Sequence, residues 1–305
     1  MLDYIIKRLF QVVIVILLAL TVVFFLIRLS GDPTTLFLPP DASREQIEEY
    51  RELLGFNRPV YVQYGDFMVN AVQGDFGQSL RSREDALQIV LSRLPATFQL
   101  AISALVLSLV ISIPLGVLSA YKRNTVFDRI GVACTVIGQA VPSFWLGLLL
   151  IYFFAAQLKI LPSGGGGTIQ HMILPMITLA AYSVARFTRF TRSTMLDVLK
   201  KDYIRTAKAS GVPTIRLIMR YALKNSLIPI ITLVALDLGV LLGGAVITEV
   251  VFAWPGIGRL LMQSLMNRDF PIVLAGVFII ALIYAVINFV ADLLYAYVNP
   301  QIRVK

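Results

Sequence analysis

The chain contains very few of the residues on which metal sites and many catalytic sites depend. Its 305 residues include one cysteine and one histidine, so an internal disulfide is impossible and a Cys or His metal site lacks ligands. A Ser-His-Asp triad would depend on His171 alone. The Gly-Lys dipeptide of a Walker A loop, which cradles phosphate, is also absent from the sequence. We therefore expect no metal, no cofactor and no P-loop ATP hydrolysis in this chain.

Charged residues are scarce as well. They make up 15% of the chain, whereas 57% of the residues are hydrophobic and the mean hydropathy is +0.78. This composition excludes an ordinary soluble domain and indicates a polytopic membrane protein. The net charge of +9 could suggest nucleic-acid binding, but an uneven distribution of Lys and Arg is also what sets membrane topology. We therefore expect membrane lipid, and no nucleic acid, among the partners.

Six windows are long and apolar enough to cross a bilayer, which requires about 20 apolar residues in a helix. They are residues 9–27, 94–121, 130–158, 170–185, 226–248 and 271–291. The first window is longer than the apolar region of a typical signal peptide, so we interpret it as a retained helix. The sequence thus predicts an all-α membrane protein with six transmembrane helices.

The distribution of charge predicts the orientation. Residues 186–225 carry ten basic and two acidic residues, whereas residues 30–93 carry six basic and ten acidic residues. Cytoplasmic loops hold the excess of Lys and Arg. Both termini lie on the same side as residues 186–225, so we predict that they are cytoplasmic.

Two connections on the outer side have recognisable patterns. In the first, Ser43 and Gln46 have the spacing of a capping box and Gly55 suits the end of the helix, which predicts a short amphipathic surface helix. In the second, the glycine run at residues 164–167 is interpreted as a flexible connector.

A cationic stretch at residues 202–224 lies between two of the most apolar parts of the chain. Tyr203, Ile204 and Ala207 have helical spacing, Gly211 can end that helix, and Pro213 suits the first turn of another. The pattern predicts two short helices joined by a tight turn.

The second of these helices is predicted to have two distinct faces. The apolar face comprises Ile215, Ile218, Met219 and Ala222, and the basic face comprises Arg216, Arg220 and Lys224. The basic face could anchor the loop to anionic lipid, and the apolar face could pack beneath the bundle. The alternative is that the pair of helices docks into a groove of a cytoplasmic partner.

The fifth window contains one acid and a small-residue pair. A charge at the position of Asp237 needs a partner or a wet cavity, so it either lines a translocation path or forms a structural hydrogen bond. Gly239 and Gly243 form a G-x-x-x-G pair that permits close helix packing.

The segment after the fifth window combines Trp254, Pro255, Gly256 and Gly258. Trp254 suits the membrane interface, and the following residues favour either a re-entrant loop or a simple interfacial turn.

Motifs along the whole chain resemble one transporter family. The stretch at 202–224 has Arg205-Thr206-Ala207, three residues, Gly211, nine residues, and then Tyr221-Ala222-Leu223-Lys224. It is similar to the cytoplasmic EAA loop of permease subunits of binding-protein-dependent ABC importers. The usual Glu and Pro are absent, as in the peptide and nickel branch. Further similar motifs are MLDYIIKRL (1–9), SGDP (30–33), GDFGQSL (74–80), ARFTRFTRS (185–193), LLGGAVITEVVFAWPGIGRLL (241–261), RDFPIV (268–273) and DLLYAYVNPQIR (292–303).

The resemblance implies the domain organisation and the partners. A type I ABC importer transmembrane domain would span residues 94–298, after an N-terminal transmembrane helix (1–29) and an extracytoplasmic loop (30–93), and before a cytoplasmic tail (299–305). The implied location is the prokaryotic inner membrane. The implied partners are a homologous second permease, two P-loop ATPase subunits carrying ATP and Mg²⁺, and an extracytoplasmic substrate-binding protein.

The resemblance also implies roles for individual residues. The ATPase-coupling residues would be Tyr203, Ile204, Arg205, Thr206, Ala207, Gly211, Arg216 and Arg220. Residues of the translocation path or gate would be Asp237, Gly239, Gly243, Glu249, Trp254, Pro255, Gly256 and Arg259.

The substrate implied by the resemblance is a dipeptide or oligopeptide, with glutathione or a nickel chelate as alternatives. From the residues alone, the competing class is an ion-coupled secondary transporter with Asp237 as its proton or cation site. A membrane-embedded enzyme is disfavoured, since the apolar windows contain no paired carboxylates, Ser/His set or metal cluster.

Overall fold

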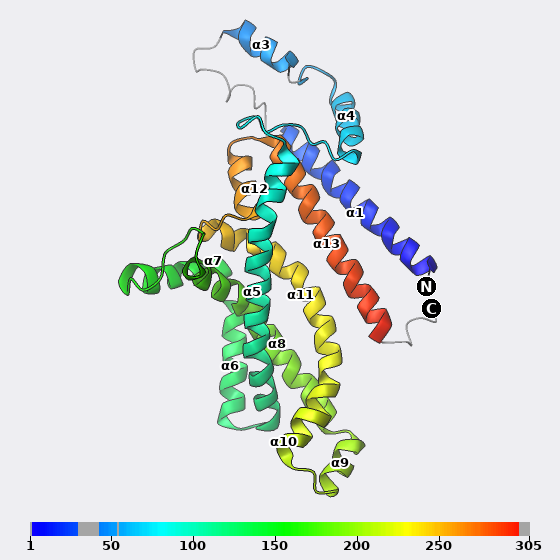
Figure 1. Cartoon of the computed structure of the whole chain (residues 1–305), viewed down its shortest axis with the longest axis vertical. Helices are drawn as coiled ribbons and strands as arrows, with labels where there is room; N and C mark the ends of the chain where they lie inside the picture. The colour runs from blue at the N-terminus through cyan, green and yellow to red at the C-terminus, as the bar shows by residue number, and fades with distance from the viewer. Residues whose placement is uncertain (1, 30–42, 54, 299–305) are drawn as a thin grey trace. The chain divides into compact units, whose positions relative to one another are not determined.

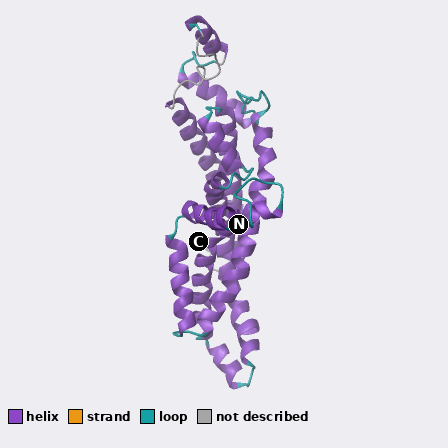
Figure 2. Cartoon of the chain, turned by 90° about the vertical axis from the view of Figure 1, so that its left-hand side faces the viewer, coloured by secondary structure: helices purple, strands orange, loops and turns teal. Residues whose placement is uncertain are grey.

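The computed structural model describes residues 2–29, 43–53 and 55–298. Within these ranges helices are the only extended regular elements, together with one isolated bridge between Gln78 and Asp85 (Figure 2). The SGDP motif at 30–33 and the predicted tail at 299–305 lie outside the described residues.

The helices form two compact units, which we describe separately. One unit comprises Met1–Pro95 with Arg259–Val286, and the other comprises Ala96–Gly258 with Ile287–Lys305. In chain order the helices are α1 (Leu2–Leu29), α3 (Arg44–Leu53), α4 (Val60–Val72), α5 (Ala86–Tyr121), α6 (Val126–Ala140), α7 (Ser143–Leu150), the π-helix η1 (Ile151–Gln157), α8 (Ile169–Leu199), α9 (Asp202–Ala209), α10 (Thr214–Arg216), the π-helix η2 (Leu217–Leu223), α11 (Lys224–Val251), α12 (Ile257–Met266) and α13 (Phe270–Val298) (Figure 1).

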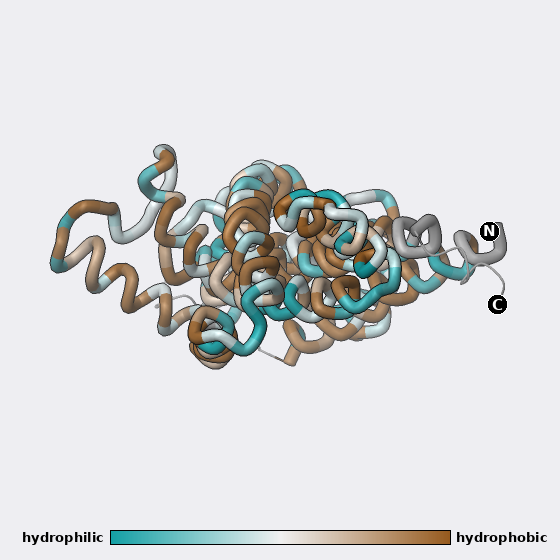
Figure 3. The backbone as a smooth tube through the Cα atoms, turned by 90° about the horizontal axis from the view of Figure 1, so that it is seen from below, coloured by the Kyte–Doolittle hydropathy of each residue, from teal (hydrophilic) through white to brown (hydrophobic). Residues whose placement is uncertain are grey.

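Among the described residues, four helical segments are long and apolar enough to cross a membrane. They are Ile6–Leu29, Ala86–Tyr121, Thr214–Val251 and Phe270–Asp292. Apolar stretches alternate with hydrophilic ones along the chain (Figure 3). The four helical segments correspond to the first, second, fifth and sixth predicted windows.

The other two predicted windows have a different form. Residues 130–158 are not one straight helix, because Val126–Ala140 and Ser143–Gln157 meet at a bend of 101° and count together as a fifth span at most. Pro142 precedes α7 at this bend, and proline disfavours helix in the residue before it. The window at 170–185 lies inside α8, whose second half carries three arginines. Six spans and cytoplasmic termini remain predictions.

The predicted capping box is present at the start of α3. The Ser43 amide donates to Gln46 Oε1 at 2.9 Å, and the Gln46 amide donates to Ser43 Oγ at 3.2 Å. Gly55 has a φ of +72° just after this helix. The predicted helix and its glycine terminator are therefore present, and the position of the helix on the outer surface stays a prediction.

Two sequence motifs meet in the first unit through one buried carboxylate. Asp269, from the RDFPIV motif, accepts a hydrogen bond from Ser79 Oγ at 2.5 Å and one from the Leu80 amide at 3.0 Å. Phe76 packs against Phe278 with ring centroids 5.0 Å apart. Residues nearly 200 positions apart in sequence are thus joined by hydrogen bonds and an aromatic contact.

Helix α8 is central to the second unit. It packs against α6, α7 and α11, and its side chains Leu174, Phe187 and Met195 are fully buried. The buried stripe continues beyond residue 185, so the arginines of the second half must lie beside apolar neighbours. Their partners define the candidate sites below.

Candidate coupling segment and buried carboxylate sites

The first half of the segment at 202–224 has the predicted form. Helix α9 runs from Asp202 to Ala209, and Gly211 follows with a φ of +77°. The Gly211 amide donates to the Lys208 carbonyl at 3.1 Å, and the Val212 amide donates to the Ala207 carbonyl at 3.2 Å. These bonds satisfy the last carbonyls of the helix, and the left-handed conformation favours glycine.

The second half differs from the prediction. Pro213 caps the next helix instead of lying in its first turn. That helix is not short, because α10 continues through η2 into α11, giving one helical segment from Thr214 to Val251. Figure 1 shows α9 and α10 at the end of α8, where the chain turns back into α11.

The π-helical turn changes which face is buried. Leu217, Ala222 and Leu223 are buried, whereas Ile215 and Met219 are 76% and 56% exposed. A π-helix bonds residues five positions apart, so the register of an α-helix fails across it. The four residues of the predicted apolar face are therefore divided: Ala222 and Ile218 pack inward, whereas Ile215 and Met219 are exposed.

The segment is built on two long helices. Its buried side chains form one cluster with residues of α5 and α8; the cluster comprises Ala120, Met195, Ile204, Ala207, Leu217, Ala222 and Leu223. Of the predicted coupling residues, Ile204 and Ala207 therefore face inward. Burial of this cluster fixes the segment to α5 and α8.

The outer surface of the segment is apolar and basic. Tyr203 is 43% exposed, and Ile215 and Met219 are exposed as well. The remaining predicted coupling residues Arg205, Thr206, Gly211, Arg216 and Arg220 are exposed, as are Lys200, Lys201, Lys208 and Lys224. The segment therefore exposes three large apolar side chains together with several basic ones.

Asp237 is a fully buried acid joined to α8. Ser183 Oγ donates to one of its carboxylate oxygens at 2.5 Å, and Arg186 Nη1 donates to the other at 2.6 Å. The ion pair and the hydrogen bond offset the cost of burying the charge. The structural alternative for Asp237 thus has the partners it requires, and its role in the pathway stays a prediction.

A cavity adjoins this pair of helices. Its volume is about 350 Å³, and its lining includes Gln139, Pro142, Tyr182, Ser183 and Val240. Ser183 both lines the cavity and holds Asp237. The bend between α6 and α7 forms another part of the wall.

The two glycines of α11 have different surroundings. Gly239 is buried, whereas Gly243 is exposed and a Cβ added there would meet nothing within 4 Å in the described chain. The close helix packing predicted for this pair is therefore not made at Gly243 within the described residues.

Glu249 holds the loop that follows α11. It is fully buried and accepts hydrogen bonds from Thr97 Oγ1 and from the Gly258 amide, each at 2.7 Å. Thr97 Oγ1 in turn accepts a hydrogen bond from the Ile257 amide at 2.9 Å. A carboxylate at the end of α11 thus fixes the start of α12 against α5.

Trp254 is packed inside this loop. It is 3% exposed, and its Nε1 donates to the Ala96 carbonyl at 2.9 Å. The indole thus completes a contact with α5 inside the protein, and its position at the membrane interface stays a prediction. Gly256 is required here, since a Cβ would collide with the Glu249 carboxylate. Pro255 is half-buried in the same loop, and Arg259 is half-buried in α12.

The glycine run at 164–167 packs against the same loop. The Gly165 amide donates to the Phe252 carbonyl at 2.8 Å, and the Gly164 backbone lies too close to Phe252 for any side chain. The interpretation of the run as a flexible connector is therefore wrong: the glycines permit close backbone contact.

Sequence reasoning missed another buried acid, the third in the second unit among the described residues. Asp128, in the first turn of α6, forms a two-point ion pair with Arg192 of α8. Its position three residues after Thr125 resembles a helix-start pattern, which was the available signal. Thus two of the three arginines of the ARFTRFTRS motif, Arg186 and Arg192, pair with buried acids.

The described side chains contain no group of three or more His, Cys, Asp or Glu that could hold a metal ion. The sites are therefore built from ion pairs, hydrogen bonds and exposed apolar surface.

Comparison with known proteins identifies the family. Residues 112–304 match the family described as "Binding-protein-dependent transport system inner membrane component", and residues 1–101 match the N-terminal component of the same systems. "Glutathione transport system permease protein GsiC" of Escherichia coli (strain K12) is 40% identical over 306 residues, covering 100% of both chains. The protein of the same name from Shigella dysenteriae serotype 1 has the same identity and coverage.

Two solved transporters share the fold at low sequence identity. The MetNI methionine ABC transporter, in an inward-facing conformation, has a TM-score of 0.56 and 17% identity, covering 70% of this chain and 97% of that chain. An amino acid ABC transporter with histidines has a TM-score of 0.53 and 19% identity, covering 69% and 92%.

The fold and motifs thus define a multi-pass inner-membrane permease. The chain belongs to the family of permease components of binding-protein-dependent ABC importers. It is a transport subunit and not an enzyme; in these importers ATP and Mg²⁺ act on ATPase partners, and a substrate-binding protein supplies the cargo.

The loop between α11 and α12 (residues 252–256), which Glu249 holds and which we call the Glu249 loop, gives a testable prediction. Thr97→Val keeps the shape of the side chain but leaves the Ile257 amide unpaired and removes one donor to Glu249, which should destabilise the protein by about 1–3 kcal/mol. Hydrogen–deuterium exchange at residues 254–258 should accelerate. Thr232→Val is the matched control, because the Thr232 hydroxyl bonds only its own helix. Unchanged hydrogen–deuterium exchange at residues 254–258 in the Thr97 variant would contradict the claim that Thr97 and Glu249 hold this loop against α5.

Proposed function

We propose that the importer carries short peptides, including glutathione, which is itself a tripeptide. Support comes from the 40% identity over the whole chain to permeases named for glutathione transport. The sequence motifs of the peptide and nickel branch support the same class. A nickel chelate is the alternative substrate, and substrate choice in this family depends largely on the binding protein.

We also propose that residues 202–224 form the docking site for an ATPase subunit. The observation that carries this proposal is that Tyr203, Ile215 and Met219 are exposed on a segment that also exposes basic side chains and whose buried side chains pack on α5 and α8. Lipid anchoring would account for the basic residues, but a partner groove accounts for the apolar ones as well. ATP bound to the partner would then act on this chain from outside.

The proposed mechanism uses α11 as a rigid link. The helical segment Thr214–Val251 has 38 residues, so it is about 57 Å long at 1.5 Å per residue. This helical segment begins within residues 202–224, which we call the coupling segment. It ends at the Glu249 loop, and Asp237 lies between its two ends. ATP-driven closure of the ATPases would tilt this helix and its neighbours, opening a central cavity alternately to the two sides of the membrane.

The pathway assignments belong to this proposal. Asp237, Gly239, Gly243 and the Glu249 loop would face or gate the central route. The exposed surface at Gly243 suits close approach by a homologous second permease. We further propose that α8 and the bent α6–α7 pair complete six spans with cytoplasmic termini, and that the domain boundaries are those predicted above. An ion-coupled mechanism is set aside by the family assignment.

The turn at Gly211 gives the first functional prediction. Valine is β-branched and disfavours the left-handed conformation by about 1–2 kcal/mol, so Gly211→Val should misplace α9. Binding-protein-stimulated ATP hydrolysis and uptake should fall in reconstituted importer. Gly211→Asn is the control, because asparagine tolerates this conformation. Normal stimulation in the Val variant would count against the coupling role.

The exposed apolar residues give a second prediction. Met219→Glu and Ile215→Glu should each weaken docking by about 1–3 kcal/mol, because a charge replaces a buried apolar contact. The measurement is the permease concentration that half-maximally stimulates purified ATPase subunits. Thr214→Glu adds the same charge at an exposed polar position and should have a smaller effect. Equal effects of all three variants would indicate general electrostatics instead of apolar docking.

Substrate class can be tested by competition. Proteoliposomes containing the full importer and its binding protein should take up labelled glutathione or a dipeptide, with each inhibited by excess short peptide. A nickel chelate should neither enter nor compete. Uptake of the chelate without competition by peptides would overturn the peptide assignment.

A further inference from the structure

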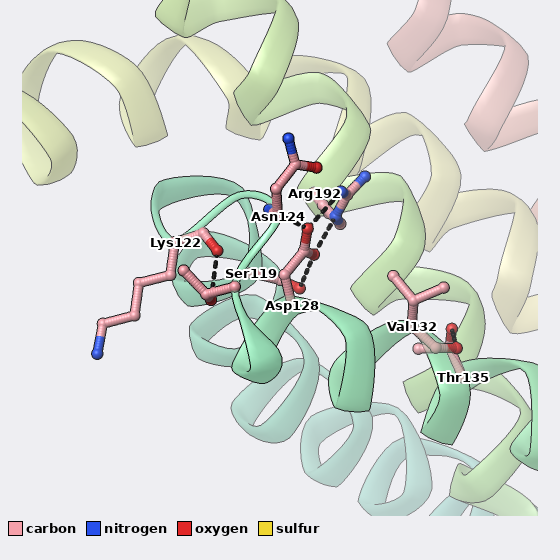
Figure 4. A network of polar contacts seen from close by, with 8 residues as sticks. Ser119, Lys122, Asn124, Asp128, Val132, Thr135 and Arg192 are labelled. Atoms are coloured by element: carbon pink, nitrogen blue, oxygen red, sulfur yellow. Dashed lines mark hydrogen bonds and ion pairs between the residues drawn. The ribbon is translucent and has the colours of Figure 1, made fainter.

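A two-point ion pair between α6 and α8, together with a hydrogen bond from α5, connects three helices of the second unit. The Arg192 guanidinium donates from Nε to Asp128 Oδ1 at 2.6 Å and from Nη2 to Asp128 Oδ2 at 2.8 Å (Figure 4). Ser119 Oγ donates to Oδ1 at 2.8 Å, and the Asn124 amide donates to Oδ2 at 2.9 Å. One nearly buried carboxylate thus accepts four hydrogen bonds.

The four groups come from different parts of the chain. Ser119 lies near the end of α5, Asn124 lies in the α5–α6 turn, Asp128 lies in the first turn of α6, and Arg192 lies in α8. Asn124 has a φ of +66°, a conformation that asparagine tolerates, and this directs its amide to the carboxylate. The α5–α6 turn is therefore fastened to α8 in one orientation.

This clamp, defined as Ser119, Asn124, Asp128 and Arg192, adjoins the cluster beneath the coupling segment. Ser119 directly precedes Ala120, and Arg192 lies one turn before Met195, both of which belong to that cluster. Displacement of α9 would therefore act on α5 and α8, two of the three helices that the clamp joins.

The other end of α6 reaches the cavity. Gln139 and Gly138 line it, as do Val141 and Pro142 at the bend that follows. The helix from Val126 to Ala140 has 15 residues and is about 22 Å long. Rotation of α6 at its clamped end would therefore move the wall of the cavity.

We propose that Asp128 and Arg192 are positioning residues that carry movement of the coupling segment into α6 and the cavity wall. This inference rests on the proposed docking of an ATPase at residues 202–224. The two-point geometry matters because it fixes orientation as well as distance, which a single contact does not. Arg189, in the same motif, is exposed and forms no part of the clamp.

The test uses the full importer in proteoliposomes with its liganded binding protein. The measured quantity is the coupling ratio, the substrate taken up per ATP hydrolysed. Asp128→Asn and Arg192→Met should each lower the ratio by about tenfold, within the range by which residues of a coupling network act. Basal ATP hydrolysis should persist. The double variant should be no worse than either single variant, because both remove the same contact.

Two further variants sharpen the result. Arg192→Lys keeps the charge but loses the two-point geometry, so an intermediate ratio is expected. Arg189→Met is the matched control on the same helix and should leave the ratio unchanged. If Asp128→Asn and Arg192→Met fail to assemble into the importer, the coupling ratio of Arg192→Lys alone decides the question.

The proposal would be overturned if the coupling ratio is unchanged in the clamp variants. The ratio is also unchanged if ATP hydrolysis and uptake fall by the same factor. That outcome would indicate a purely structural contact and would likewise overturn the proposal. Failure of the docking proposal has a different signature: Met219→Glu would then leave ATPase stimulation intact. The two failures are therefore distinguishable.

Discussion

A carboxylate buried among apolar helices costs several kcal/mol unless cations or hydrogen-bond donors surround it. The described part of the second unit contains three such acids, Asp128, Asp237 and Glu249, and each is held by groups from at least one other helix. The need to satisfy these charges determines which helices lie together. Helix α8 supplies arginines to two of them, and α5 supplies hydroxyl groups to two. The fold is thus specified by polar contacts at a few points within an apolar structure.

This arrangement suits a subunit that receives its energy from another protein. Family membership places ATP hydrolysis on the partners, and the segment at 202–224 has an inner face packed on α5 and α8 and an outer face of apolar and basic residues. The same segment leads without a break into the helix that carries Asp237 and Glu249. The buried acids therefore lie on the elements that would have to move together during transport.

The sequence predicted local features well and long-range pairing poorly. The capping box of α3 and the helix end at Gly211 depend on neighbouring residues, and both are present. The division of the predicted apolar face, with Ala222 inward and Met219 outward, was not foreseen because a π-helical turn breaks the periodicity on which the prediction rested. Asp128 and Arg192 are 64 positions apart, so no spacing rule could pair them. The bend at Pro142 divided a window that composition alone made continuous. Family resemblance supplied the function class, which periodicity alone left open.

The central claim is that the energy for transport enters this chain through a docked partner. Its most direct test is to tag the chain, extract it gently from its native membrane, and quantify by mass spectrometry the proteins bound to it. The account predicts a second permease and P-loop ATPase subunits in stoichiometric amounts. Recovery of the chain alone, or only with copies of itself, in several mild detergents would contradict it.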